Sequence, residues 1–130
     1  YIEGWDKDFS ISHTRDISVV AVASETIGID IEDIGRDIDL EKFKRTKFLN
    51  FDEGAYSNKE EFLMRFTALE AYLKYIGKGF YKDARTICVK KIAEGIVIDD
   101  GKVIKAEVIK DGGYTISIVM LKPLEIDGIK

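Results

Sequence analysis

Two acidic residues stand two positions apart inside an apolar, β-branched run, Gly28-Ile29-Asp30-Ile31-Glu32. Because side chains alternate between the two faces of a strand, Asp30 and Glu32 point one way and the isoleucines the other. Neighbouring carboxylates repel each other unless a cation lies between them, and Mg²⁺ binds through one or two carboxylates, water and substrate phosphates. The run alone fits either a magnesium site or a solvated strand face beside a buried one.

A second segment, residues 66–74, lies in a stretch that predicts one long helix over 58–76. Ser57 or Asn58 can cap the start of this helix, and Gly77 is expected to end it in a left-handed conformation. The helix carries one apolar stripe with steps of four, three, four and three, made of Phe62, Phe66, Leu69, Leu73 and Ile76. We therefore expect Leu69 to be buried against a sheet.

Two further features could carry chemistry. Glu70 and Lys74 are four residues apart at the edge of the apolar stripe, where they form either part of a site or an ordinary helical ion pair. Residues 9–14 alternate like a strand and reach His13, the only histidine of the chain. A single histidine fits a structural role as well as a catalytic one, so neither feature is decisive alone.

Taken in order, these segments resemble the 4′-phosphopantetheinyl transferases of the surfactin-synthetase-activating type. The resemblance rests on Ser10-Ile11-Ser12-His13-Thr14, Ile27-Gly28-Ile29-Asp30-Ile31-Glu32, and Phe66-Thr67 through Glu70-Ala71 to Lys74, followed by Gly77-Lys78-Gly79. It spans residues 9–80, and residues 114–119 look like the closing strand of the family. Each motif is weak alone, but three motifs in the family order make a specific match.

The resemblance implies transfer of the phosphopantetheine arm of coenzyme A to a serine of an acyl or peptidyl carrier protein, with Mg²⁺ as cofactor. The implied site residues are Asp30, Glu32 and Glu70 for Mg²⁺, Glu70 and Lys74 for catalysis, and His13, Thr14, Arg15 and Lys74 for coenzyme A. Glu70 is in addition the candidate to accept the proton of the carrier serine.

The chain departs from the family pattern in two ways. Leu69 stands where the family usually has lysine, and Phe66 stands where tryptophan is frequent. Members of this type also contain two similar α+β halves with coenzyme A between them, whereas residues 1–130 resemble one half-domain plus the Ser-His segment. This leaves three alternatives: a working transferase half that pairs with a missing half or forms a homodimer, a catalytically incomplete binding module, and an unrelated Mg²⁺-dependent phosphate-ester enzyme.

Composition and charge narrow the class of protein. A chain of 130 residues is long enough for one domain with a sizeable core, and no apolar run approaches the ~20 residues of a membrane span. Cys88 is the only cysteine, which rules out an internal disulfide and favours a reducing, cytoplasmic setting. The net charge of −4 argues against a nucleic-acid partner.

Positive charge is concentrated in one short segment, at Lys42, Lys44, Arg45 and Lys47. Carrier proteins are acidic, so this cluster could steer one towards the site. The same pattern is typical of an ordinary solvated helix face, and the sequence leaves both interpretations open.

The periodicity predicts strands at 8–13, 17–24 and 27–32, helices at 39–48 and 58–76, and strands at 85–92, 95–99, 102–110 and 113–121. Hairpin turns are expected at Asp99-Asp100-Gly101 and Asp111-Gly112-Gly113. The short connection between 17–24 and 27–32 predicts that these two strands are antiparallel neighbours. The expected fold class is α+β, an antiparallel sheet packed on one long helix.

Overall fold

The computed structural model describes residues 8–77 and 83–120. The elements are β1 (Asp8–His13), β2 (Ser18–Ala23), β3 (Ile27–Asp33), α1 (Leu40–Thr46), β4 (Asn50–Phe51), the 3-10 turn η1 (Glu53–Tyr56), α2 (Lys59–Ile76), the 3-10 turn η2 (Ala84–Thr86), β5 (Cys88–Ile92), β6 (Gly95–Asp99), β7 (Val103–Asp111) and β8 (Tyr114–Met120). The predicted helices and strands occur in the predicted order, whereas β4, η1 and η2 were not predicted, and η2 replaces the start of the strand predicted over 85–92. The last predicted strand ends at residue 121, which lies outside the described residues.

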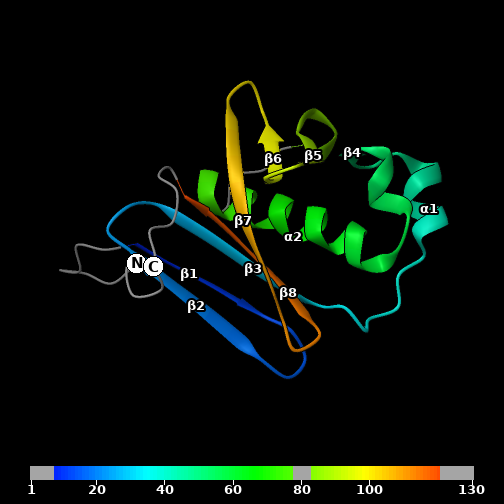
Figure 1. The fold of residues 1–130 in the computed structure, drawn as a ribbon. Coiled ribbons are helices and arrows are strands. Elements are labelled where there is room, and N and C mark those ends of the chain that lie inside the picture. The colour runs from blue at the N-terminus through cyan, green and yellow to red at the C-terminus, as the bar shows by residue number, and fades with distance from the viewer. Residues whose placement is uncertain (1–7, 78–82, 121–130) are drawn as a thin grey trace.

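Six strands form one sheet in the order β3-β8-β7-β6-β5-β4. Their pairs are antiparallel except that the two-residue β4 runs parallel to β5. The sheet curls around α2, which packs against β3, β5, β6, β7 and β8 (Figure 1). The predicted α+β class is confirmed, with a mixed rather than purely antiparallel sheet.

Helix α2 begins as predicted but is buried on more of its surface. The Asn58 side chain caps it by accepting a hydrogen bond from the Glu61 N–H at 2.9 Å. Leu69 is 1% exposed, which confirms its predicted burial. The predicted apolar stripe was only partly right, because Phe66, Leu73 and Ile76 are half-buried. Besides Phe62 and Leu69, the buried residues of the helix are Leu63, Met64, Ala68, Ala71 and Tyr72 and the polar Arg65 and Thr67. The left-handed end was wrong: Gly77 has a φ of 165°, which is extended backbone.

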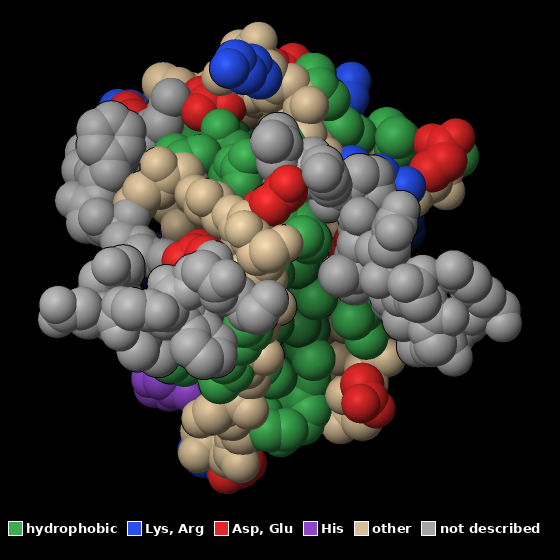
Figure 2. Space-filling model, turned by 90° about the vertical axis from the view of Figure 1, so that its left-hand side faces the viewer, with side chains coloured by type: hydrophobic (Ala, Val, Ile, Leu, Met, Phe, Trp, Pro, Cys, Tyr) green, Lys and Arg blue, Asp and Glu red, His purple; other side chains and the backbone are tan. Residues whose placement is uncertain are grey.

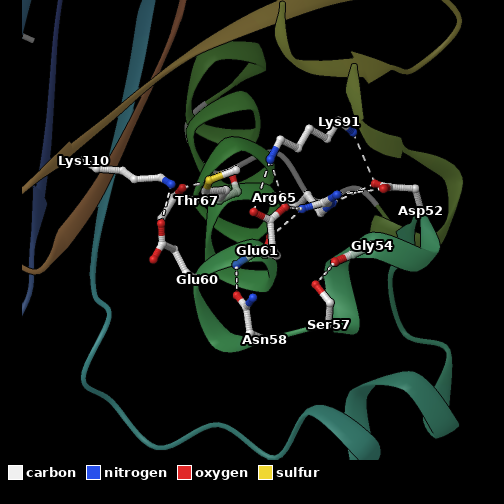
Figure 3. A network of polar contacts seen from close by, with 11 residues as sticks. Asp52, Gly54, Ser57, Asn58, Glu60, Glu61, Arg65, Thr67, Lys91 and Lys110 are labelled. Carbon is white, nitrogen blue, oxygen red and sulfur yellow. Dashed lines mark hydrogen bonds and ion pairs between the residues drawn. The ribbon is translucent and has the colours of Figure 1, made fainter. Parts of the chain in front are cut away.

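A polar network fixes the first half of α2 to its neighbours (Figure 3). The buried Arg65 guanidinium donates to both carboxylate oxygens of Asp52 at 2.7 Å and to Glu61 at 3.0 Å. Lys91 on β5 reaches the same Glu61 at 3.2 Å. Arg65 therefore links α2 to the residue that follows β4, and Glu61 extends the network to β5 through Lys91. The two carboxylates compensate the guanidinium charge, whose burial without partners would be costly.

The β1–β2 hairpin forms a separate two-stranded sheet, with Asp8 opposite Ala23 and His13 opposite Ser18. The predicted pairing of strand 17–24 with strand 27–32 is therefore wrong, since β3 pairs with β8. The free edge of β3 instead meets side chains of β1: Asp8, Ser10 and Ser12 accept hydrogen bonds from the N–H groups of Ile27, Ile29 and Ile31 at 3.0, 3.0 and 3.2 Å. These side chains satisfy the backbone donors that strand pairing would otherwise use.

Gly28 lets β3 and α2 approach at backbone distance. A Cβ atom at this position would lie 2.0 Å from the Ala71 carbonyl oxygen and 2.7 Å from the Tyr75 nitrogen. Only a residue without a side chain fits there. The close approach puts the strand that carries Asp30 directly beside the helix turn that carries Glu70 and Lys74.

Candidate active site

Asp30 is the most buried of the predicted site residues, at 7% exposure. Its Oδ1 accepts hydrogen bonds from Ser12 Oγ at 2.8 Å and from Lys74 Nζ at 3.3 Å. Its Oδ2 is buried and has no hydrogen-bond partner among the described residues. Burial raises the pKa of the carboxyl, the bonds to Ser12 and Lys74 oppose that rise, and the charge of Glu32 adds to it.

Glu70 projects from α2 into the same neighbourhood. Burial raises its pKa, and the charge of Asp30 raises it further, while Lys74 counteracts and Glu32 adds a smaller increase. The strand pair and the helix glutamate therefore lie within electrostatic reach of one another. Lys74 compensates this mutual repulsion only in part, because the pKa values of Asp30 and Glu70 stay raised despite its charge.

Glu32 lies at the more open end of this cluster. Its Oε1 accepts a hydrogen bond from Arg36 Nη1 at 2.7 Å. Across the residues that the structure describes, no group of three or more His, Cys, Asp or Glu side chains is close enough to hold a metal ion as it stands. The donor set nevertheless fits a hard cation, because the buried Asp30 Oδ2 has an unused lone pair and the carboxyl groups of Asp30 and Glu70 both have a raised pKa, mainly through burial. Glu32 would have to exchange Arg36 for the ion.

Lys74 connects the two sides of the site. Its ammonium donates to the carbonyl oxygens of Ile11 on β1 and Ile29 on β3, at 3.2 and 3.0 Å, and to Asp30. An ammonium has three donors, and these contacts use all of them. Lys74 must therefore give up one acceptor before it can hold a phosphate.

The structure does not bring His13, Thr14 and Arg15 against the carboxylates. His13 ends β1 and is exposed, and strand alternation places it on the opposite side from the buried Ser12. The Thr14 N–H bonds to the Ile17 carbonyl at 2.9 Å in the turn of the hairpin, and Arg15 is exposed in that turn. Lys78 and Gly79, which completed the third motif, lie outside the described residues.

Sequence reasoning missed the part played by the serines of β1. Ser10 and Ser12 are both buried and bond to β3, and Ser12 also bonds to Asp30. The available signal was their spacing of two, which matches the spacing of Asp30 from Gly28. Nothing in the sequence pattern showed that β1 would lie along β3.

The fold and this cluster define an α+β domain in which acidic residues of one strand and one helix share a site with a lysine. Two comparisons with known proteins agree on its family. The sequence profile described as the 4′-phosphopantetheinyl transferase superfamily matches residues 26–119. The 4′-phosphopantetheinyl transferase gsp of Aneurinibacillus migulanus is 31% identical over 91 residues, which cover 67% of this chain and 38% of that protein.

The chain therefore belongs to the 4′-phosphopantetheinyl transferase superfamily. The profile covers β3 through β8 and all three predicted carboxylates, whereas the β1–β2 hairpin precedes it. The match spans well under half of the curated relative. In the described part of the chain, no helix has the length and apolar character needed to cross a bilayer.

Proposed function

We propose that this chain contributes the catalytic cluster for transfer of a 4′-phosphopantetheine arm from coenzyme A to a serine of an acyl or peptidyl carrier protein. The serine oxygen would bond to the phosphorus that carries the pantetheine arm, the bond from that phosphorus to the bridging oxygen would break, and 3′,5′-adenosine bisphosphate would leave. The observation that carries this proposal is the grouping of Asp30, Glu70 and Lys74 within the region that matches the family.

Phosphoryl transfer of this kind depends mainly on positioning and charge neutralisation. In our proposal Asp30, Glu32 and Glu70 hold Mg²⁺, which when bound offsets the negative charge that develops on the leaving oxygen. Glu70 accepts the serine proton, directly or through water. Its pKa is raised by burial and by Asp30, which makes it a stronger base than an ordinary glutamate.

The phosphates of coenzyme A require cations. The Lys74 contact with Asp30 is the longest of its three, so we propose that Lys74 exchanges this contact for a phosphate oxygen and keeps its two carbonyl acceptors. His13, Thr14 and Arg15 would meet the 3′-phosphate from the open end of β1. Leu69 cannot help, because it is buried and uncharged.

The carrier protein would approach over α1. No residue of this helix is buried, so Lys42, Lys44 and Arg45 all lie at the surface. Phe43 anchors the helix by packing its ring 4.9 Å from that of Phe62. Beside it, a hollow of about 330 Å³ is lined in part by Phe43, Lys42 and the 61% exposed Phe48. The lining of the hollow itself is mixed in charge, with Asp37 and Asp39 beside Arg36 and Lys42, so the attraction for an acidic carrier would come from the exposed basic residues of α1. Charge reversal at Lys42 and Arg45 should therefore weaken carrier binding most at low salt.

Apolar surface supports assembly with further protein. Hydrophobic side chains form a band on the face shown in Figure 2. On the β1–β2 hairpin, Ile11, Val20 and Val22 are 51%, 59% and 52% exposed, and Ile11 lies directly opposite Val20. Contiguous exposed apolar residues mark interaction surfaces. We propose that this chain pairs either with a second α+β half or with a copy of itself, in the cytoplasm, where coenzyme A and carrier proteins are available.

Sedimentation across a concentration series tests the pairing. Self-association of the chain, or its capture of a separately produced first half, is the expected result. A monomer at high concentration that also ignores such a half would contradict it.

The activity is tested with purified chain, Mg²⁺, a fluorescent coenzyme A analogue and an apo carrier protein. Label should appear on the carrier serine, and Glu70→Gln and Asp30→Ala should abolish the transfer while circular dichroism shows an intact fold. Equal transfer by Glu70→Gln and the parent chain would refute the role of Glu70.

A second candidate function is a binding module without catalysis. It is favoured by Leu69 in place of the family lysine and by the limited span of the match. This candidate predicts that the chain binds Mg²⁺ and coenzyme A in calorimetry but transfers nothing, even with a first half present. Membership of the superfamily excludes the third alternative, an unrelated magnesium enzyme.

A further inference from the structure

Strands β1 and β3 are joined along their shared edge, here called the seam, by three side-chain to backbone hydrogen bonds. One of the three side chains, Ser12, makes a further bond to the site that the other two do not make. Asp8, Ser10 and Ser12 each accept one N–H of β3, at intervals of two residues on both strands. Ser10 and Ser12 are almost equally buried, at 4% and 5% exposure. Only Ser12 also donates to a site carboxylate, at 2.8 Å from Asp30 Oδ1. The Ser12 hydroxyl therefore contacts the candidate site in addition to joining β1 to β3.

The two oxygens of Asp30 are in unequal surroundings. Oδ1 is held by Ser12 and Lys74, whereas Oδ2 is buried without a partner among the described residues. The Ser12 contact is the stronger restraint, because it is shorter and comes from a short, buried side chain that Ile31 N–H also holds. Lys74 ends a long flexible stem, with a third of its side chain exposed, and its contact is 3.3 Å. Without the serine hydroxyl, the broad torsion about the carboxyl bond would be poorly restrained.

We propose that Ser12 is the positioning residue of Asp30: it fixes Oδ1 and thereby presents Oδ2 as the free, preoriented metal-binding oxygen. The inference rests on the proposed function, in which the Asp30 carboxylate binds Mg²⁺. Removing partners that orient a metal ligand typically weakens metal binding 10- to 100-fold. The loss should occur without any change in the number of carboxylates.

The experiment compares Ser12→Ala with Ser10→Ala. Each variant removes one buried hydroxyl and leaves one buried N–H of β3 without its acceptor, so both should lower the urea midpoint, and Ser12→Ala should lower it further because it also removes the bond to Asp30. Calorimetric titration with MgCl₂ should show a Kd about tenfold or more weaker for Ser12→Ala and within about twofold of the parent for Ser10→Ala. Ser12→Thr, which keeps the hydroxyl on a strand-compatible residue, should recover most of the affinity.

A second measurement needs no metal. The ¹³C resonance of the Asp30 carboxyl, recorded at one fixed pH without Mg²⁺, should move in Ser12→Ala and stay in place in Ser10→Ala and Ser12→Thr. If the two alanine variants give the same Kd and the same resonance, Ser12 acts only in the seam and the inference is overturned. If the parent chain binds no Mg²⁺ but the resonance still moves only in Ser12→Ala, the proposed metal site fails while the positioning contact stands.

Discussion

Replacing Gly28 with alanine tests how the fold assembles the site. The added methyl group would lie 2.0 Å from the Ala71 carbonyl oxygen and 2.7 Å from the Tyr75 nitrogen. Both neighbours are backbone atoms of α2, so no change of rotamer can relieve the clash. Carbon atoms of side chains essentially never approach other heavy atoms closer than 3.0 Å, so strand and helix must separate by about 1 Å, the difference between 3.0 and 2.0 Å.

This separation has two consequences of different size. Overpacking in a core costs about 1–3 kcal/mol and occasionally more, and a backbone clash belongs at the upper end, so we expect a loss of about 3 kcal/mol. The stiffer unfolded chain returns about 0.4–1 kcal/mol of this. At the site, the backbones that carry Asp30 and Lys74 would move apart by about 1 Å, so the 3.3 Å contact between the two side chains would have to stretch or re-form with an extended lysine stem. A misplacement of about 1 Å can lower activity about 100-fold.

Urea unfolding and the transfer assay measure the two effects separately. Gly35→Ala is the matched control, because its added methyl would meet only the flexible Asp33 side chain, at 3.2 Å. The control should change stability by less than about 1 kcal/mol and leave transfer unaffected. If Gly28→Ala unfolds at the same urea concentration as the parent, β3 and α2 are not in backbone contact and our account of the site geometry is refuted.

Three further substitutions probe separate parts of the molecule. Asp52→Asn should cost about 3 kcal/mol at neutral pH, because Arg65 loses one of its two carboxylate partners. The hydrogen bond from Arg65 lowers the pKa of Asp52, so the ionised Asp52 carboxylate stabilises the fold fully above the ordinary pKa of 3.8, and this stabilisation is lost as pH falls through the pKa of the folded state. The difference in urea midpoint between parent and Asp52→Asn should therefore shrink in acid, and a constant difference would contradict the prediction. Leu69→Ala should lose about 2–5 kcal/mol by urea unfolding, and a loss below 1 kcal/mol would show that Leu69 is not a core residue. Asp30→Asn should raise the urea midpoint of the metal-free chain at neutral pH. Burial raises the pKa of the Asp30 carboxyl, so the stability of the parent chain falls as pH rises through that pKa, and the uncharged asparagine avoids this loss. A lowered midpoint would show that the contacts of Asp30 with Lys74 and Ser12 outweigh the cost of burial.

Local features of the fold could be read from the sequence because they depend on neighbouring residues. Asn58 caps α2 through its own next turn, and the paired glycines Gly112 and Gly113, both with positive φ, make the predicted turn between β7 and β8. Long-range features could not be read in this way. The Arg65 network joins residues 52, 61, 65 and 91, and no periodicity encodes that they meet. A buried arginine inside an apolar helix also contradicts the pattern from which the stripe was predicted.

The candidate site likewise has local features that the sequence predicted and long-range features that it did not. The spacing of two in β3 and of four in α2 put Asp30, Glu70 and Lys74 on suitable faces, and the close approach at Gly28 brings those faces together. The engagement of Glu32 with Arg36 was not predicted, because it depends on the turn that follows β3. The role of Ser12 was not predicted either, because side-chain bonds between two strands leave no hydrophobic signature.

The candidate site lies at the edge between β1 and β3, where Ser12 bonds both to the backbone of β3 and to Asp30. A continuous backbone ladder would have held the strands firmly but would have left Ser12 and Lys74 without their contacts across the seam. The side-chain ladder instead docks β1 through Asp8, Ser10 and Ser12 and keeps polar groups beside a buried carboxylate whose charge burial disfavours. Ligands that bind the folded chain stabilise it, so Mg²⁺ bound at Asp30 would offset that unfavourable charge and tighten the seam at once. The β1–β2 hairpin would thus be coupled to the proposed metal site through Ser12, which bonds both to the backbone of β3 and to Asp30.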